Sequence, residues 1–376
     1  MKRISFLGST GSVGRHALEV VAHLGEGFGV SALAAKENID LLEVQARAFR
    51  PEVIAVFDEA KARELKGRLP GFRVVGGMEG LCEAAIVGDM VLSAMSGTMG
   101  LRPTLAAIRA GKDVALANKE TLVSGGDFVL GEVERFGVKL LPVDSEHSAL
   151  FQCLVGEDRH EVSRLILTAS GGPFRETPLS ELERMGAKEA LSHPTWQMGP
   201  KITVDSSTLM NKGLEMIEAH HLFGLPVEKI EVIVHPQSII HSLVEFQDGS
   251  MKAQASKPDM KLPIQYAFTY PKRRVGMMKP FDFISAGKLE FYQADTSKFR
   301  CLALAYWALK QGGTLPGFMN AANEVLVERF LRREIRWVDI ATKLEILMEK
   351  HRKVPTLDLE TILEVDLLAK KEAAYV

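Results

Sequence analysis

The chain has 376 residues, of which 46% are hydrophobic and 25% are charged, the proportions of an ordinary globular protein. This composition excludes fibrous and disordered classes, and the length predicts about two or three domains, each large enough to bury its own core. Its 46 Lys and Arg residues against 48 Asp and Glu give a formal charge of −2, so charge gives no reason to expect nucleic acid or an acidic membrane as partner. We therefore expect a small-molecule partner.

The cysteines and the apolar runs bear on the cellular compartment. Cys82, Cys153 and Cys301 are scattered and form no CxxC pair, so we expect no disulfide framework or structural zinc site and a reducing environment. The apolar run at residues 4–7 is too short for the core of a signal peptide, and no stretch approaches the ~20 apolar residues of a membrane helix. The sequence thus predicts a cytoplasmic protein.

The N-terminal part alternates between short apolar runs and amphipathic segments. The runs lie at residues 4–7, 30–34, 53–57, 72–75, 90–94, 114–117 and 140–143. Helical periodicity between them, as in residues 12–24 and 39–49, predicts a mainly parallel sheet covered by helices on both faces. We expect residues 1–144 to form a Rossmann-like, doubly wound α/β domain.

Beyond residue 144 the pattern changes. Expected strands lie at residues 162–169, 230–235, 239–246 and 251–256, and expected helices at residues 299–311, 317–332 and 338–351. The strands predict a central α+β domain with an antiparallel component over residues 145–269. A stretch rich in Pro and basic residues begins a linker at residues 270–297, and a helical C-terminal domain is expected at residues 298–376.

A glycine-rich loop, GSTGSVG, occupies residues 8–14 between the first expected strand and the first expected helix. Glycines at such a turn let the backbone approach a pyrophosphate, whose charge is met by amide groups at the helix N-terminus. The GxxGxxG spacing departs from the commoner GxGxxG, and an ordinary tight turn is the alternative.

The end of the second expected strand bears on the choice between NADPH and NADH. An acidic side chain at this place usually binds the ribose 2′-hydroxyl of NAD, whereas a basic one accommodates a 2′-phosphate. Lys36 favours NADPH, and Glu37 beside it weakens that inference. Both side chains as solvated loop charges are the alternative.

Two carboxylates follow directly on the seventh expected strand. Asp144 and Glu146 are at i and i+2, which places them on one side of an extended segment at the ligand-binding edge of the sheet. Such close carboxylates repel unless a cation intervenes, and Mg²⁺ or Mn²⁺ prefers oxygen ligands. An N-cap followed by a first-turn acid of the next helix is the alternative.

A third carboxylate lies in a segment with helical periodicity at residues 205–217. Asn211 and Lys212 precede Glu215 by four and three residues, so all three share a helix face. The Asp-Ser-Ser start of this segment offers hydroxyl and amide groups near a helix N-terminus, where a phosphate binds well. A capped surface helix with one Lys–Glu pair is the alternative.

Three further segments carry polar groups in places suited to ligands. Residues 170–174 (SGGPF) end a strongly apolar strand and expose amide groups to an anion, and residues 193–201 (HPTWQMGPK) suit a lid that excludes water. Residues 118–120 (NKE) follow an expected strand, so Lys119 lies where a substrate oxygen would bind. The alternatives are a turn, a surface loop and a helix-start salt bridge.

Taken together and in order, several of these motifs resemble a known family. They lie at residues 8–14, 118–120, 143–147, 170–174, 193–201, 205–215, 235–238 and 320–324. The set is similar to the 1-deoxy-D-xylulose 5-phosphate reductoisomerase family over nearly the entire chain. That resemblance implies an enzyme of non-mevalonate isoprenoid biosynthesis, which rearranges and reduces a phosphorylated deoxyketose to 2-C-methyl-D-erythritol 4-phosphate.

The resemblance also implies cofactors and site residues. The cofactors are NADPH and a divalent metal, for which Mg²⁺ or Mn²⁺ is expected and Co²⁺ is a third candidate. The metal ligands fall on Asp144, Glu146 and Glu215, and these three with Lys119 are the catalytic residues. Substrate contacts fall on Lys119, Ser145, Glu146, Ser170, His193, Trp196, Ser206, Asn211, Lys212 and Glu215. Cofactor contacts fall on Thr10, Gly11, Ser12, Val13, Lys36, Asn38, Asn118, Glu120 and Gly199.

Further implications of the resemblance concern mechanism and assembly. The metal acts as Lewis acid and template, retro-aldol and aldol steps rearrange the carbon skeleton, and hydride from NADPH reduces the resulting aldehyde. A homodimer forms through the sheet of the central domain. Residues 35–38 (AKEN) depart from the family's Gly-Lys-Asn by an extra acid, so the strength of the preference for NADPH stays open.

Two other functions are compatible with the residues alone. One is another two-domain NAD(P)-dependent dehydrogenase, which seldom needs a metal. The other is a non-catalytic NADPH-sensing protein, which needs the glycine loop but has no use for three carboxylates and a phosphate site. Metal dependence and turnover of a sugar phosphate distinguish them.

Overall fold

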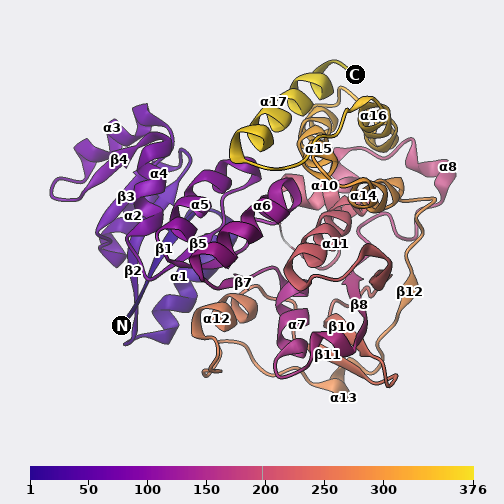
Figure 1. Ribbon diagram of the computed structural model, residues 1–376, viewed down its shortest axis with the longest axis horizontal. Helices are drawn as coiled ribbons and strands as arrows, with labels where there is room; N and C mark the ends of the chain where they lie inside the picture. Colours follow the sequence, from indigo (N-terminus) through magenta and orange to yellow (C-terminus); the bar gives the residue numbers. More distant parts are fainter. Residues whose placement is uncertain (197) are drawn as a thin grey trace. The chain divides into compact units, whose positions relative to one another are not determined.

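The computed structural model of the protein describes residues 1–196 and 198–376. The chain forms two compact units that interleave along the sequence (Figure 1). Unit 1 comprises Met1–Thr121, Val129–Ser148 and Asp259–Lys279; unit 2 comprises Leu122–Phe128, Ala149–Pro258 and Pro280–Val376. No helix among the described residues is long and apolar enough to cross a lipid bilayer.

Unit 1 is built on a seven-stranded parallel sheet with the order β4-β3-β2-β1-β5-β6-β7. Its strands are β1 (Lys2–Leu7), β2 (Phe28–Ala35), β3 (Val53–Val56), β4 (Val74–Gly76), β5 (Met90–Ser93), β6 (Asp113–Leu116) and β7 (Leu140–Pro142). The chain adds β2, β3 and β4 on one side of β1 and β5, β6 and β7 on the other. The carboxyl end of β1 is therefore the switch point at which such sheets bind ligands.

Helices connect these strands. They are α1 (Ser12–Leu24), α2 (Ile39–Phe49), α3 (Glu59–Arg68), α4 (Gly77–Ile86), η1 (Gly97–Gly100), α5 (Leu101–Arg109), α6 (Glu120–Phe136), α7 (Ser145–Leu154) and α12 (Lys261–Thr269). Helix α4 packs across β1, β2 and β3, and α12 packs against α1, β6 and β7. Helix α6 bends at Gly125, and both α6 and α7 contribute residues to each unit. The doubly wound N-terminal fold is confirmed.

Unit 2 contains a five-stranded sheet with the order β11-β10-β8-β9-β12, in which only β8 and β9 are parallel. Its strands are β8 (Val162–Ala169), β9 (Ile230–Val234), β10 (Ile240–Phe246), β11 (Met251–Ala255) and β12 (Tyr292–Gln293). Its helices before residue 300 are η2 (Arg159–Glu161), α8 (Leu179–Leu182), α9 (Ala187–Ala190), α10 (Pro200–Thr208), α11 (Met210–Phe223), η3 (Val227–Lys229) and α13 (Phe283–Ala286). The expected antiparallel component is present.

The C-terminal part of unit 2 is helical, as predicted. Its helices are α14 (Arg300–Gln311), α15 (Leu315–Leu331), α16 (Trp337–Lys350) and α17 (Leu359–Tyr375). Helix α15 packs against α14, α16 and α17, and α11 packs against α14 (Figure 1). One continuous apolar core therefore joins the C-terminal helices to α10, α11 and the sheet.

Candidate active site

The glycine loop lies between β1 and α1 of unit 1, at the switch point of the sheet. A Cβ atom on Gly14 would lie 2.2 Å from the carbonyl oxygen of Gly8, so only glycine lets the helix start this close to the loop. Gly11 and Ser12 are exposed, and α1 has neither a side-chain cap nor an acid in its first turn. The amide groups of this turn thus fit a pyrophosphate.

The remaining predicted cofactor residues of this loop and of the second strand are also at the surface. Thr10 and Val13 are partly exposed, whereas Lys36 and Asn38 are exposed in the turn after β2. The Asn38 side chain caps α2, because its Oδ1 accepts a hydrogen bond from the Leu41 amide at 3.2 Å. Lys36 is therefore the better placed of the two side chains to meet a 2′-phosphate.

A buried side chain that the sequence analysis did not single out holds the glycine loop. The Ser9 hydroxyl donates to Gln45 Oε1 at 2.8 Å, and Gln45 Nε2 donates back to the Ser9 carbonyl oxygen at 2.9 Å. Ser9 is fully buried and Gln45 nearly so. This reciprocal pair fastens the loop to α2, the helix that begins three residues after Lys36.

We expect the substitution Gln45→Ala to weaken NADPH binding by about tenfold, because loss of the pair frees the loop and leaves the Ser9 hydroxyl unpaired. Titration of protein fluorescence with NADPH measures the dissociation constant. Glu43→Ala on the same helix, whose carboxylate pairs with Arg47 at the surface at 2.7 Å, is the control and should change affinity less than twofold. An equal change in both variants would contradict the assignment.

At the carboxyl ends of β6 and β7, Lys119 and Asp144 form an ion pair. Lys119 Nζ lies 2.6 Å from Asp144 Oδ2, and the two side chains are only 9% and 13% exposed. Asn118 is committed to its own loop, because Oδ1 accepts the Thr121 amide at 3.0 Å and Nδ2 donates to the Gly97 carbonyl oxygen at 3.1 Å. The Lys119 ammonium is thus held at the ligand-binding edge of the sheet.

The segment after β7 differs from the extended geometry that the sequence analysis used to bring its carboxylates together. Helix α7 begins at Ser145, and the Ser148 amide donates to the Asp144 carbonyl oxygen at 2.8 Å. Asp144 precedes the helix and Glu146 lies in its first turn, because Asp and Ser favour helix starts over strands. The Ser145 hydroxyl donates to Glu146 Oε2 at 2.7 Å.

In unit 2, helices α10 and α11 meet at Leu209, whose φ of +58° turns the chain between them. The expected face on α11 is present: Asn211 Nδ2 donates to Glu215 Oε1 at 2.6 Å, and Lys212 Nζ lies 2.5 Å from Glu215 Oε2. Glu215 is 1% exposed and Lys212 is 4% exposed. A buried carboxylate and a buried ammonium are stable only when they are paired with each other. Because burial of both charges is costly, the pair favours a functional site over a capped surface helix.

The lid segment begins beside the loop that ends β8. His193 Nδ1 accepts the amides of Thr195 and Trp196 at 3.1 and 2.9 Å, so the ring is neutral and its Nε2–H donates to Ser170 Oγ at 3.0 Å. Burial lowers the pKa of His193. The ring centroid of Trp196 is 6.4 Å from that of His241. Gln197, within the expected lid, lies outside the described residues.

His241 is a second side chain that the sequence analysis did not single out. It is 3% exposed on β10, and burial together with the nearby Lys212 ammonium lowers its pKa to about 4. A neutral imidazole at this place leaves Lys212 as the charged member of this pair. Only the three-dimensional structure brings the two residues together, since 29 residues separate them in the sequence.

We expect kcat/KM for the sugar phosphate to fall only at a pH below the ordinary histidine range, because burial lowers the pKa of His193 and protonation of this ring removes the acceptor for two loop amides. The folded-state pKa lies below the unfolded one, so the stabilisation of the loop is fully present above the unfolded pKa and is lost as the pH falls through the folded-state pKa. A pH series from 5.5 to 8 at saturating NADPH measures it. In His193→Gln the part of the pH dependence that comes from protonation of His193 should be absent. The same pH profile in this variant and the wild-type protein would contradict the role given to His193.

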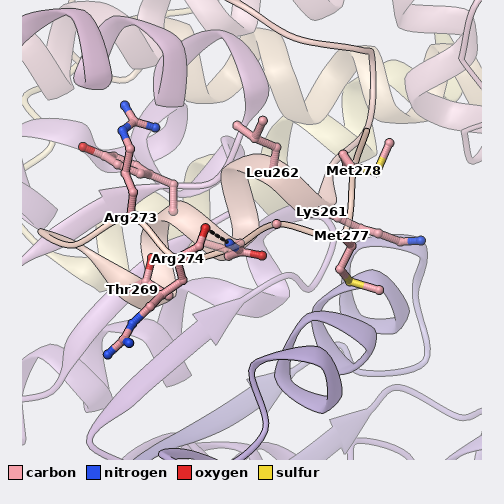
Figure 2. A pocket seen from close by; sticks show the side chains of 10 residues that line it. Lys261, Leu262, Thr269, Arg273, Arg274, Met277 and Met278 are labelled. Carbon is pink, nitrogen blue, oxygen red and sulfur yellow. Dashed lines mark hydrogen bonds between the residues drawn. The ribbon is translucent and has the colours of Figure 1, made fainter. Parts of the chain in front are cut away.

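Unit 1 also has a partly open pocket of about 190 Å³ lined by α12 and the chain that follows it. Figure 2 shows that the side chains of Lys261, Arg273 and Arg274 on its lining point in different directions. Lys261 pairs with Glu19 at 2.7 Å. These cations do not converge on one anion, and no predicted site residue lines the pocket, so we do not place the substrate there.

Comparison with known proteins gives a consistent result. Models of 1-deoxy-D-xylulose 5-phosphate reductoisomerase match residues 4–126, and models of its C-terminal domains match residues 140–223 and 255–372. The enzyme of this name from Protochlamydia amoebophila is 61% identical over 100% of this chain and 98% of its own length. That from Acetivibrio thermocellus is 52% identical over 99% and 98%.

Solved structures agree. The reductoisomerase from Zymomonas mobilis in complex with NADPH has a TM-score of 0.94 at 41% identity, covering 99% of this chain and 98% of that one. A DOX-P reductoisomerase in complex with NADPH, fosmidomycin and magnesium has a TM-score of 0.95 at 37% identity, covering 99% and 97%.

A dinucleotide-type sheet, together with a second unit that buries an acid beside an ammonium, is typical of two-unit oxidoreductases. The chain belongs to the 1-deoxy-D-xylulose 5-phosphate reductoisomerase family. The resemblance seen in the sequence is therefore confirmed, and the two other functions weighed there are set aside.

Proposed function

We propose that the two units divide the chemistry of the family reaction between them, unit 1 binding NADPH and unit 2 binding the substrate phosphate. The protein is an NADPH- and metal-dependent oxidoreductase and isomerase that converts 1-deoxy-D-xylulose 5-phosphate to 2-C-methyl-D-erythritol 4-phosphate. The observation that carries the division is the Lys212–Glu215 pair of α11, which is buried although the burial of two charges is costly, and whose ammonium suits an anion site.

NADPH is assigned to the carboxyl end of the unit 1 sheet. The uncapped amides of α1 receive the pyrophosphate, and Lys36 receives the 2′-phosphate. The residues assigned to it are Thr10, Gly11, Ser12, Val13, Lys36, Asn38, Asn118, Glu120 and Gly199. Gly199, the residue before α10, and Glu120, the first residue of α6, are assigned on family resemblance alone.

The substrate phosphate is assigned to Ser170, Ser206, Asn211 and Lys212, all of unit 2. Lys212 supplies a positive charge and Asn211 supplies an amide donor. The hydroxyls of Ser170 and Ser206 donate hydrogen bonds to further phosphate oxygens. His193 holds the Ser170 hydroxyl, and Trp196 lies on the same loop, where closure excludes water from the reacting carbons. Binding the remote phosphate orients the substrate.

The divalent metal is assigned to Asp144, Glu146 and Glu215. All three donors are carboxylate oxygens, which fit Mg²⁺ or Mn²⁺ rather than a soft metal. When bound, the metal supplies Lewis-acid polarisation of the substrate carbonyl, and NADPH supplies the hydride. Lys119 holds Asp144 in place at 2.6 Å, and the Ser145 hydroxyl does the same for Glu146.

The test is NADPH oxidation, followed by absorbance, with purified protein and 1-deoxy-D-xylulose 5-phosphate. We expect turnover with Mg²⁺ or Mn²⁺, loss of turnover in EDTA, and recovery when metal is restored, with methylerythritol phosphate as the product. Full activity in EDTA would refute the metal assignment, and NADPH binding without turnover under any metal would refute the activity.

We also propose that the protein is a cytoplasmic homodimer. The cysteines Cys82, Cys153 and Cys301 are free, in keeping with a reducing compartment. Strand β11 is at the edge of the unit 2 sheet, and Met251 on it is 49% exposed. The edge strand of a sheet offers backbone N–H and C=O groups with which a second copy can pair. Light scattering on a sizing column, with a mass near twice 41.4 kDa, tests the dimer.

A further inference from the structure

One motif from the sequence analysis, residues 320–324 (NAANE), has no role in the site described above. It lies on α15, and Asn320 and Asn323 are fully buried there. Asn323 Nδ2 donates to Asp205 Oδ1 at 2.8 Å, across 118 residues of sequence. Its partner is on α10, one residue before Ser206 of the proposed phosphate site.

Asp205 is a buried carboxylate with a partner on each oxygen. It is 1% exposed, and Lys201 Nζ at the start of α10 lies 2.9 Å from its Oδ2. A buried carboxylate is stable only when paired and hydrogen-bonded, so the position of α10 depends on the Asn323 amide as well as on its own lysine.

Two further contacts also join C-terminal helices to α10 and α11. Trp337 Nε1 of α16 donates to Ser207 Oγ of α10 at 2.9 Å. A Cβ atom on Gly213 of α11 would lie 2.5 Å from Cβ of Ala305 on α14. Three C-terminal helices thus hold the two helices that meet at Leu209, on both sides of that turn.

We propose that Asn323, through Asp205, is a positioning residue that sets the affinity of the enzyme for the phosphate of its substrate. The amide fixes the end of α10, and with it Ser206 and the start of α11, in the arrangement that receives a phosphate. The C-terminal helices thereby act in substrate binding without touching the substrate. This inference rests on the phosphate site proposed above.

The test compares Asn323→Ala with Tyr306→Phe. Tyr306 is the matched control: its hydroxyl on α14 donates to the Ile230 carbonyl oxygen at 2.9 Å, a bond from the same helices to the sheet instead of to α10. We expect Asn323→Ala to raise, by about tenfold and by the same factor, the KM of the sugar phosphate and the inhibition constant of inorganic phosphate. The NADPH dissociation constant should stay within twofold.

The control should leave both phosphate constants within twofold although it also loses a partly buried hydrogen bond. Equal effects in the two variants, or unchanged phosphate constants in Asn323→Ala, would overturn the proposal. Lys212→Ala is measured in parallel, since it must weaken phosphate binding if the site itself is right. Failure of Lys212→Ala refutes the site, whereas failure of Asn323→Ala alone refutes only the positioning role.

An exchange variant covers the case in which Asn323→Ala does not fold. Asn323→Asp alone sets two carboxylates against each other, and adding Asp205→Asn restores one donor and one acceptor across the contact. We expect the double variant to recover phosphate affinity relative to Asn323→Asp. No recovery in a folded double variant would overturn the proposal.

Discussion

Replacing Glu215 by glutamine is expected to lower kcat by at least about 10³-fold, because the variant loses a charged metal ligand while keeping the shape of the side chain. The Asn211 amide still has an oxygen to donate to, so we expect the fold to persist with a lower unfolding midpoint. Steady-state kinetics at saturating Mn²⁺ measures kcat, and calorimetric titration measures Mn²⁺ affinity, which should fall at least about tenfold.

Lys212→Met separates the two roles of this buried pair. It also breaks the 2.5 Å contact with Glu215, but it removes no metal ligand. We expect Mn²⁺ to bind this variant with unchanged affinity while the KM of the sugar phosphate rises. Near-normal turnover of Glu215→Gln at saturating metal would exclude Glu215 as a ligand.

A second large effect is expected from Gly172→Ala, in the loop that ends β8. Gly172 has a φ of +67°, and an added Cβ would lie 2.5 Å from the backbone carbonyl oxygen of Ser206. The left-handed backbone costs about 1–2 kcal/mol. The clash displaces the proposed phosphate site, and a misplacement of about 1 Å costs on the order of 100-fold in kcat/KM.

Gly249→Ala is the matched control for the backbone cost alone. Gly249 has a φ of +83° and nothing within 4 Å of its added Cβ. Thermal unfolding should show a loss of stability in both variants, whereas kinetics should show a loss of kcat/KM only in Gly172→Ala. If Gly172→Ala loses stability and keeps its kcat/KM, the contact with Ser206 does not shape the phosphate site.

The parts of the fold that sequence alone predicts well are those whose patterns are local. Helix α1 and strand β8 begin and end where the sequence analysis placed them, at residues 12–24 and 162–169. Within the helical domain expected at residues 298–376, no separate helix was predicted at α17, because its apolar stripe is obscured: Asp366 is buried, whereas Leu367 is 68% exposed. Polarity along this helix therefore does not report which face is inside.

In the candidate site, too, contacts within a short segment could be predicted, whereas contacts between distant segments could not. The acid, ammonium and amide of α11 follow from helical spacing within five residues, and the structure has them in contact. The extended backbone expected at Asp144 and Glu146 was wrong, since the preference of Asp and Ser for helix starts outweighs the preceding strand, but the expected proximity of their carboxylates is confirmed, with oxygens within 4.8 Å of each other. The pairs Ser9–Gln45 and Asp205–Asn323 join residues far apart in the sequence, for which spacing gives no signal.

The interleaving of the two units has a consequence for how the chain is made. The last segment of unit 1, Asp259–Lys279, is synthesised long after the strands of its sheet. Helix α12 in that segment packs on α1. Roughly 110 residues of unit 2 leave the ribosome first, which takes about 6–20 s at 5–20 residues per second. During that interval the nucleotide-binding half exposes the surface that α12 later covers, so a chaperone has a defined substrate and a defined time in which to act.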